Sequence, residues 1–438
     1  MQERIASYTI MRHLFSRILN IFIPDGHCLL TPDSWEELNR CDVLLCCHDA
    51  SRGLEVDGKA YSPILDSLAQ DLQAAGLKID RLAKWGSVLV GDRAYGSPKG
   101  VNRLVFIFKI KRIIRSWASK VSIIADGSHW PRNPYDRILE ITNCKCVIVI
   151  GANELLIHSA RGKGIHVIEL LHGIGFTPVP WGWDKLDISS LPTGVLSLDA
   201  ISTKTFKQLE CKGVKVKQVS HPWFRRYNVS GKSGIPDQLK QKISDHNYTS
   251  YILVSLAWGY DGEPSALPGV SGVLPNGVIP EALIEAIQNT KESVFWFLRL
   301  HPVQMNNEYR YWRHIKLVNN IVEENPNAES AVSSTCELRT ILSHCIGHIS
   351  MCSSTCYEAS FMGVPSLLMC PTLAPGEPQG EKFPDLREEG FVELKVRPKS
   401  SDIVQWALRV NRQAPKNYGE GAEDWGEVVR WMLGDDRN

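Results

Sequence analysis

Two doubly wound α/β domains that face each other across a cleft are predicted by three features of this 438-residue sequence. Short apolar runs alternate with segments of helical periodicity, which is typical of βαβ units and parallel sheets. The alternation is interrupted at residues 225–249 by a polar segment that contains glycine and proline. The length also exceeds that of one ordinary hydrophobic core. We predict an N-terminal domain over 1–235, a C-terminal domain over 236–412, and a final helical segment, 413–438, packed back toward the first domain.

Charge balance and cysteine spacing limit the classes of function. Lys plus Arg (49) nearly equals Asp plus Glu (48), which argues against a nucleic-acid binder that relies on net charge. The 12 cysteines include no Cys-x-x-Cys pair, so a zinc site is disfavoured and a reducing compartment fits. The sequence shows no secretion signal and no run of roughly 18 to 20 apolar residues. We therefore expect a cytoplasmic protein.

Two basic and apolar segments leave contact with a membrane surface open. Residues 9–23 and 102–120 both combine apolar side chains with Arg or Lys, a composition that suits an anionic lipid surface. The simpler interpretation is a helix packed on its own domain for 9–23 and a solvated helix face for 102–120. Peripheral attachment to the cytoplasmic face of the inner membrane is kept as the alternative.

The N-terminal half alternates strand and helix patterns. Its first convincing strand, 42–46, ends at His48 and Asp49, and a polar loop and a helix with Pro63 near its first turn follow. Further strands are expected at 87–90, 121–125, 146–150, 166–170, 194–198 and 214–219. Helical segments are expected at 102–120, 134–142, 153–161 and 204–209. This order predicts a parallel sheet.

Strand ends in this half supply two candidate general bases. The strand 166–170 leads into His172 and two nearby glycines, where the backbone turns tightly or approaches a ligand. Imidazole titrates near neutral pH and can deprotonate a hydroxyl. Asp49 is the second candidate, although a turn or capping role is also open to it. Glu169 would orient His172 if both side chains faced the same side of the strand.

The C-terminal half repeats the alternation after a first strand at 251–256. A long loop rich in glycine and proline, 257–279, follows that strand and is expected to be functional. Further strands are expected at 294–300, 331–334, 345–350, 365–369 and 391–394. Helices are expected at 280–291, 307–324, 336–343, 355–362, 402–410 and 425–433.

The apolar run 294–300 carries the sharpest motif. Its carboxyl end carries Arg299 and is followed directly by His301 and Pro302. Ligands of open α/β sheets bind outside the carboxyl ends of the strands. A cation and an imidazole at such a position suit a phosphate group, so Arg299 and His301 are predicted to bind one.

A second polar group follows the strand 345–350. Ser353, Ser354 and Thr355 stand where a helix begins, and their hydroxyls and free N–H groups suit phosphate, although an ordinary N-cap role is also open. Glu358, in the first turn, is placed to accept hydrogen bonds from ribose hydroxyls or to complement the helix dipole. Together with His301, these residues predict one site for a nucleotide phosphate.

Metal dependence is not expected. The sequence contains no Asp-x-Asp motif, the usual divalent-ion motif of nucleotide-sugar transferases with a single Rossmann-like domain. Arg299, His301 and the nearby hydroxyls can stabilise leaving-group charge without a metal. We predict that no metal or other cofactor is required.

The motifs resemble those of bacterial glycosyltransferases of the GT-B fold, which consists of two Rossmann-like doubly wound domains. The similar group holds capsule-polysaccharide synthesis proteins, polysialyltransferases and CDP-glycerol glycerophosphotransferases. The resemblance rests on short motifs that span most of the chain in order. They are His172-Gly173, Arg299-x-His301-Pro302, Ser353-Ser354, Glu358-Ala359 and Gly363-Val364-Pro365.

The resemblance implies a role for each motif. His301 and the Ser353-Ser354 pair would contact the donor phosphate, Glu358 would bind the ribose, and His172 would be the base, as in glycerophosphotransferases. Polysialyltransferases instead use an acidic-acidic-Gly motif, of which Glu55-Val-Asp57-Gly58 is only a loose echo. The choice between His172 and Asp49 as base therefore stays open.

The predicted function is an inverting, metal-independent glycosyltransferase that acts on a growing bacterial surface polysaccharide, such as O-antigen, lipopolysaccharide or capsule. Its partners would be a nucleotide-sugar donor and a glycan or lipid-linked glycan acceptor, and not nucleic acid. A nucleotide-sugar 2-epimerase and a CDP-glycerol-type glycerophosphotransferase are alternative enzymes. A non-catalytic glycan- or nucleotide-binding partner in polysaccharide assembly is the alternative from another class.

Overall fold

The computed structural model describes seven stretches of the chain. The predicted helix 9–23 and the predicted strand 121–125 lie outside them, as do residues 228–236 and 245–247 of the predicted linker. The described residues are 29–120, 132–227, 237–244, 248–260, 269–305, 308–417 and 421–434.

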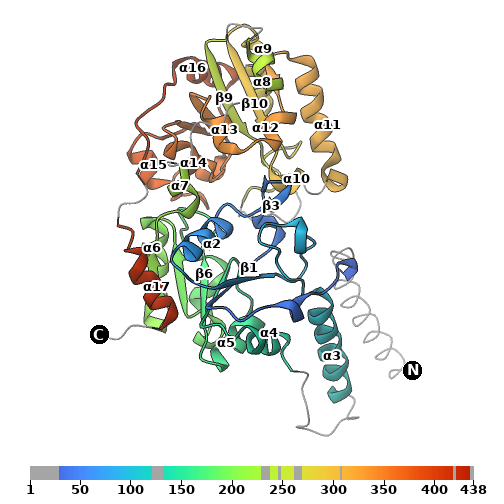
Figure 1. Cartoon of the computed structure of the whole chain (residues 1–438). Coiled ribbons are helices and arrows are strands. Elements are labelled where there is room, and N and C mark those ends of the chain that lie inside the picture. Colours follow the sequence, from blue (N-terminus) through green and yellow to red (C-terminus); the bar gives the residue numbers. More distant parts are fainter. Residues whose placement is uncertain are drawn as a thin grey trace, which may run out of the picture.

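The N-terminal half forms a six-stranded sheet in the order β4-β1-β5-β6-β7-β8 (Figure 1). All neighbouring strands are parallel. The chain moves from β1 outward to β4 and then crosses to β5 on the other side of β1, so the order reverses between β1 and β5. The strands are β1 (Val43–Cys47), β4 (Ile79–Ala83), β5 (Cys146–Val149), β6 (His166–Leu170), β7 (Gly194–Ser197) and β8 (Lys215–Gln218).

The C-terminal half forms a second six-stranded sheet in the order β11-β10-β9-β12-β13-β14. Its strands are also parallel, and its order reverses between β9 and β12. The strands are β9 (Ser250–Ser255), β10 (Val294–Arg299), β11 (Ala328–Glu329), β12 (Gly347–Ser350), β13 (Ser366–Leu368) and β14 (Val392–Leu394). The predicted fold of two Rossmann-like α/β domains is therefore confirmed.

Helices cover both faces of each sheet (Figure 1). A short antiparallel hairpin of β2 (Leu54–Val56) and β3 (Lys59–Tyr61) follows β1. The N-terminal half contains α2 (Leu65–Ala74), α3 (Asn102–Lys120), α4 (Pro134–Thr142), α5 (Glu154–Gly162), α6 (Ala200–Phe206) and α7 (Pro222–Tyr227). The remaining helices are α8 (Asp237–Ser244), α9 (Glu281–Asn289), α10 (Pro302–Met305), α11 (Glu308–Glu324), α12 (Ala331–Thr335), α13 (Leu338–Leu342), α14 (Thr355–Phe361), α15 (Pro384–Glu388), α16 (Ser400–Arg409) and α17 (Trp425–Leu433).

Two expected strands are wrong. Residues 87–90 form a loop, and the strand lies earlier, at β4, which pairs with β1 and, through a single bridge, with Lys99. Residues 331–334 belong to helix α12, because the Glu329 carboxylate accepts the backbone N–H groups of Val332 and Ser333 at 2.6 and 2.9 Å. A side-chain cap of this kind satisfies the first N–H groups of a helix and favours it over a strand.

Helix α17 packs on the N-terminal sheet although it ends the described chain. Val428, Trp431 and Met432 are buried with Leu196 and Val219 in one apolar cluster. Gly194 of β7 is required here, since a Cβ at this position would lie 2.5 Å from the Trp431 ring. The predicted boundaries at 235 and 412 stay predictions.

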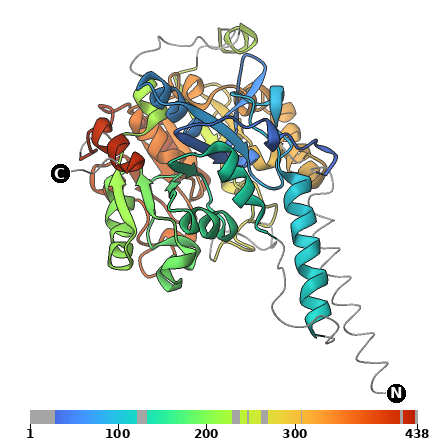
Figure 2. The same cartoon turned by 60° about the horizontal axis from the view of Figure 1, so that its bottom comes forward.

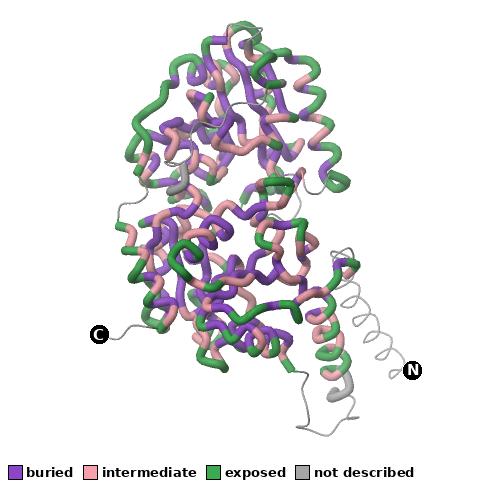
Figure 3. Tube along the Cα trace, in the orientation of Figure 1, coloured by how far each residue is buried: buried purple, intermediate pink, exposed green. Residues whose placement is uncertain are grey.

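Helix α3 projects from the body of the N-terminal half (Figure 2). The strands of both sheets are buried, whereas much of α3 is exposed or only half-buried (Figure 3). No helix of the described residues is long and apolar enough to cross a membrane.

The loops at the carboxyl ends of the two sheets contact each other. Ile174, after β6, packs against apolar clusters of both halves. Gly175 lies directly against the hydroxyl of Tyr357 on α14. The Phe224 ring of α7 stacks on Phe361 of α14, with centroids 4.5 Å apart. These contacts place the strand-end loops of both domains at one junction.

Candidate functional site

His301 is held in a defined orientation at the end of β10. Its backbone N–H donates to the Gln304 side-chain oxygen at 2.8 Å, and its Nδ1 accepts the Val303 N–H at 3.2 Å. Burial, and then the nearby Arg299, lower the pKa of His301 to about 4. The imidazole is therefore neutral at neutral pH, with its hydrogen on Nε2, because Nδ1 is used as an acceptor. His301 thus presents a single N–H donor.

Gln304 anchors this turn to the neighbouring strand. Its side chain is fully buried, and its Nε2 donates to the carbonyl of Ala257 at 3.0 Å, just beyond β9. The next residue, Trp258, places its ring 5.1 Å from the His301 ring. The carboxyl ends of β9 and β10 are therefore fixed relative to each other, with the indole and the imidazole side by side.

Arg299, the last residue of β10, is held by contacts with the segment that follows β11. Its Nη1 donates to the carbonyls of Ser333 and Cys336, the second at 2.7 Å. A phosphate contact would therefore have to use Nε or Nη2. The guanidinium also acts on Glu358: burial raises the pKa of this carboxyl to about 7, and Arg299 partly opposes the shift. Glu358 is thus poised to change charge near neutral pH.

The hydroxyl groups after β12 divide into two kinds. The Ser353 hydroxyl accepts the Thr355 N–H at 3.2 Å and donates to its Oγ1 at 2.9 Å. The Ser353 hydroxyl therefore satisfies the N–H group of Thr355, the first residue of α14, and both hydroxyls are engaged with each other. Ser354, between them, has an exposed side chain. Of the three, it is the one most available to a ligand.

His172 lies beyond the end of β6 among aromatic and basic side chains. Its ring is 6.0 Å from that of Phe176 and 6.3 Å from that of Trp181. Removal from water, followed by the charge of Lys84, lowers its pKa. The His172 side chain nevertheless keeps substantial exposure. It is therefore surrounded by protein yet accessible, and neutral at neutral pH, which is the protonation state of a base.

Glu169 does not orient His172. Its carboxylate accepts the backbone N–H groups of Gly151 and Ala152 at 2.6 and 2.7 Å. These bonds hold the loop after β5. The interpretation that Glu169 orients the histidine is wrong, because both of its carboxylate oxygens are bonded to the loop after β5, and His172 lies two residues beyond the end of β6.

Asp49 organises a loop. Its Oδ2 accepts the backbone N–H groups of Val88 and Leu89 at 2.6 and 3.3 Å. This is the turn role that the sequence left open for it. Its loop still approaches the donor side, since a Cβ at Gly53 would lie 3.9 Å from the Pro302 ring.

The structure thus brings the predicted residues into two neighbouring groups. Arg299, His301, Ser354 and Glu358 lie at the carboxyl ends of β10 and β12. His172 lies across the junction, on a loop whose Gly175 touches α14. Their predicted binding and catalytic roles stay predictions.

Sequence reasoning missed Lys84, Trp258 and Gln304. Lys84 follows β4, and its Nζ would lie 2.6 Å from a Cβ at Gly151. The misplaced strand at 87–90 hid it, since a correct β4 would have shown a lysine at a strand end. Trp258 lies two residues beyond the predicted strand 251–256, so its position at a strand end could have been recognised from the sequence. Gln304 gave none, because its role depends on contacts with distant residues.

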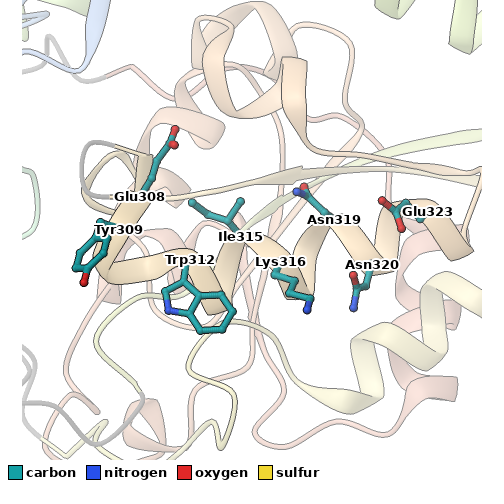
Figure 4. A pocket seen from close by; sticks show the side chains of 8 residues that line it. All are labelled: Glu308, Tyr309, Trp312, Ile315, Lys316, Asn319, Asn320 and Glu323. Atoms are coloured by element: carbon teal, nitrogen blue, oxygen red, sulfur yellow. The ribbon is translucent and has the colours of Figure 1, made fainter.

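An open hollow of about 590 Å³ lies elsewhere, along α11 (Figure 4). The residues that line it all come from this one helix and include Tyr309, Trp312 and Lys316. None of them is a strand-end residue of either sheet. Among the residues that the structure describes, no three His, Cys, Asp or Glu side chains gather as a metal site would require.

Known structures share this architecture. No protein family model and no curated protein sequence matches the chain. The wall teichoic acid polymerase TagF is similar over 99% of this chain and 96% of its own, at 11% identity and a TM-score of 0.52. The UDP-GlcNAc 2-epimerase of Neisseria meningitidis, bound to UDP-GlcNAc, is similar over 90% of this chain and all of its own, at 11% identity and a TM-score of 0.50.

A third neighbour is the UDP-GlcNAc 2-epimerase of Methanocaldococcus jannaschii, solved with UDP-GlcNAc and UDP. It covers 89% of this chain and 99% of its own, at 10% identity and a TM-score of 0.50. These neighbours are enzymes of the GT-B superfamily. At such low sequence identity, structural similarity shows only the fold. This chain therefore has the GT-B fold.

Proposed function

We propose that the protein is a glycosyltransferase that moves a sugar from a nucleotide-sugar donor to a bacterial surface glycan, such as O-antigen or capsule. Transfer is inverting and independent of metal. The donor binds at the carboxyl ends of β10 and β12, and the acceptor lies on the N-terminal side of the junction.

The observation that carries this proposal is the fixed, neutral His301. Its Nδ1 is committed to the Val303 N–H, so Nε2–H is the only donor that the ring offers. A preorganised donor at a strand end stabilises negative charge on a departing phosphate without reorganisation during the reaction. The exposed Ser354 hydroxyl adds a second donor, and the Glu358 carboxylate suits the ribose hydroxyls.

His172 is the base in this proposal. Its imidazole takes the proton of the acceptor hydroxyl while the acceptor oxygen forms a bond to the anomeric carbon. The bond from that carbon to the donor phosphate breaks, and its electron pair leaves with the nucleotide. A single displacement of this kind inverts the anomeric configuration. Burial, and then the positive charge of Lys84, lower the pKa of His172, so its imidazole is unprotonated at neutral pH and free to accept the proton.

Nucleotide binding is the first test. CMP, CDP, UDP, GDP and dTDP are each screened by thermal shift, where a ligand at a hundred times its Kd adds about 2.7 kcal/mol of stability. We expect one base to stand out, and its sugar nucleotides are then assayed for transfer with and without EDTA. Transfer that survives EDTA supports the proposal. Complete loss that Mn²⁺ restores would contradict metal independence.

The two candidate bases are separated by substitution. His172→Ala is expected to lower kcat about a hundredfold or more, the usual contribution of a general base. Asp49→Asn keeps an oxygen that can accept from the 88–89 loop and removes only the charge, so we expect little change in kcat. The reverse ranking would assign the base to Asp49.

A 2-epimerase is the second candidate, favoured by the architecture shared with the two epimerases over about nine-tenths of this chain. Incubation with UDP-GlcNAc alone distinguishes it, because a 2-epimerase changes the configuration at C2 without an acceptor, which yields either UDP-ManNAc or free ManNAc and UDP. A CDP-glycerol-type glycerophosphotransferase is tested in the same assay with CDP-glycerol as donor. Nucleotide binding without turnover of any donor would indicate a non-catalytic partner.

A further inference from the structure

An aromatic cluster borders His172 on the N-terminal side of the junction. It consists of Phe176, Trp181, Trp183 and Phe206. Trp183 and Phe206 are buried, whereas Trp181 is 50% exposed. The Trp181 ring lies 5.0 Å from Trp183 and 6.5 Å from Phe206, measured between centroids. The cluster thus supports the indole from within and leaves part of it open to solvent.

The Trp181 backbone adopts a conformation that disfavours a bulky side chain. Its φ and ψ are 60° and 12°, in the left-handed region. This region costs roughly 1–2 kcal/mol for residues other than glycine. Gly182 follows with a φ of 69° and has open space around it. The strain at Trp181 therefore accompanies the presentation of a large aromatic surface, and such strain tends to occur at functional sites.

The orientation of the Trp181 indole relative to His172 limits the shape of a ligand that could contact both rings. The two rings are nearly parallel, at an interplanar angle of 28°, with centroids 6.3 Å apart. The two rings are therefore neighbours, and a ligand that packs on the exposed part of the indole lies close to the imidazole. A pyranose suits this place, because one face carries C–H groups that pack on an aromatic ring while its rim carries hydroxyls.

We propose that Trp181 is the stacking platform for the acceptor sugar, a pyranose that places one hydroxyl at His172. This inference rests on the proposed function and deepens it, since it names the acceptor subsite. A sugar is favoured over a nucleobase here because His301, Ser354 and Glu358, the groups suited to a nucleotide, lie at the carboxyl ends of the other sheet. Trp181 is a binding residue and takes no part in proton transfer.

Direct binding at this side chain tests the proposal. The protein, with its 13 tryptophans, is labelled with 5-fluorotryptophan, and Trp181→Phe and Trp312→Phe assign two ¹⁹F resonances. Trp312 is the matched control, because it is 53% exposed and lies on α11. Methyl pyranosides of glucose, galactose, mannose and N-acetylglucosamine are titrated, with sorbitol as a polyol that lacks a ring.

We expect at least one pyranoside to shift the Trp181 resonance, with Trp312 unmoved and sorbitol without effect. Equal shifts at both tryptophans, or no shift at Trp181 beyond that from sorbitol, would overturn the platform. So would a Trp181 shift produced by UDP or CMP but by no pyranoside, because that result assigns the indole to the nucleobase.

A kinetic readout separates the inference from the proposed function. With methyl pyranosides as surrogate acceptors, Trp181→Ala is expected to raise the acceptor KM about tenfold, which corresponds to about 1.4 kcal/mol. Trp181→Tyr should retain most of the affinity, and the donor KM should stay unchanged. If a nucleotide stabilises the protein but Trp181→Ala leaves the acceptor KM unchanged, the platform fails and the transferase proposal stands. If no nucleotide stabilises it, the transferase proposal itself fails.

Discussion

His301 shows how a single side chain can be prepared for one chemical task. Burial and Arg299 keep its imidazole neutral, and the Val303 N–H decides which nitrogen carries the hydrogen. Gln304 fixes the backbone on which the ring stands. The outcome is a hydrogen-bond donor whose direction is set before any ligand arrives, and such preorganisation is the main source of electrostatic catalysis.

Replacement of His301 by Ala is expected to lower kcat by about two orders of magnitude or more, as for the loss of one oxyanion-stabilising donor. The fold should survive, since the Gln304 contact uses the backbone of residue 301. Steady-state transfer and thermal melting measure the two effects. His344→Ala, at an exposed position beyond α13, is the control. Near-normal turnover of His301→Ala would remove this residue from the leaving-group role.

Glu358 is expected to make donor binding depend on pH. Its pKa of about 7 lies well above the ordinary value for a glutamate because burial outweighs the effect of Arg299. The carboxylate that accepts hydroxyl hydrogens is therefore lost as the pH falls through about 7. We expect the donor KM to rise over this range, and Glu358→Gln to give a high donor KM that no longer depends on pH there.

Initial rates across the neutral range measure this effect. Glu337→Gln is the matched control, because Glu337 is another carboxyl near Arg299 whose pKa is raised by burial. A Glu358→Gln variant that kept the full pH dependence of the donor KM would show that another group titrates.

Helix α3 exposes both apolar and basic side chains to solvent. Ile107 and Ile114 are 50% and 62% exposed, two turns apart, and Lys111 and Arg112 are exposed between them. We propose that this helix contacts an anionic membrane surface, where apolar side chains enter the interface and basic ones meet lipid headgroups.

Combined replacement of Ile107 and Ile114 by Ser is expected to weaken binding to vesicles of phosphatidylglycerol and phosphatidylcholine about tenfold or more, through lost apolar burial. Co-sedimentation measures it. Leu408→Ser, which changes a residue 54% exposed on α16, is the control. Equal binding of the wild type and the double variant would leave α3 an ordinary solvated helix.

Element boundaries show where local patterns mislead. Residues 87–90 are apolar enough to suggest a strand, yet two of their N–H groups bond to Asp49 from a distant loop. The true edge strand, β4, includes the polar Asp80 and Arg81. Arg81 is buried beside Asp66 on α2, with 3.4 Å between Nε and Oδ1. An edge strand with charged positions is hard to recognise without its partner.

At the scale of the whole molecule, Gly175 decides how closely the two domains meet. Its φ is +71°, and the space above its Cα is taken by the Tyr357 hydroxyl. An alanine here would add left-handed strain of roughly 1–2 kcal/mol and also push α14 away from the loop that carries His172. We expect Gly175→Ala to reduce transfer strongly.

The control for Gly175→Ala is Gly390→Ala, because Gly390 has a similar φ of +75° and no atom within 4 Å of the added methyl group. The two variants share the backbone strain, so a difference in kcat isolates the domain contact. Thermal melting should show a loss of stability from backbone strain in both variants, and a further loss in Gly175→Ala from the contact with Tyr357. Equal kcat for both variants would mean that the junction tolerates this displacement.

The sequence by itself determined the fold and the positions of the main motifs. Alternating strand and helix periods are local properties, and they predicted both sheets, the strand before His301 and the helix after Ser354. Tertiary structure alone decided what each side chain does. The Asp49 and Glu169 carboxylates bond to backbone N–H groups of other loops, and the aromatic cluster beneath Trp181 joins residues that the linear pattern does not relate. Hydrogen bonding and desolvation depend on distances between segments remote in the chain, so the hydrogen bond of His301 and the lowered pKa values of His301 and His172 follow from the packing of the folded chain.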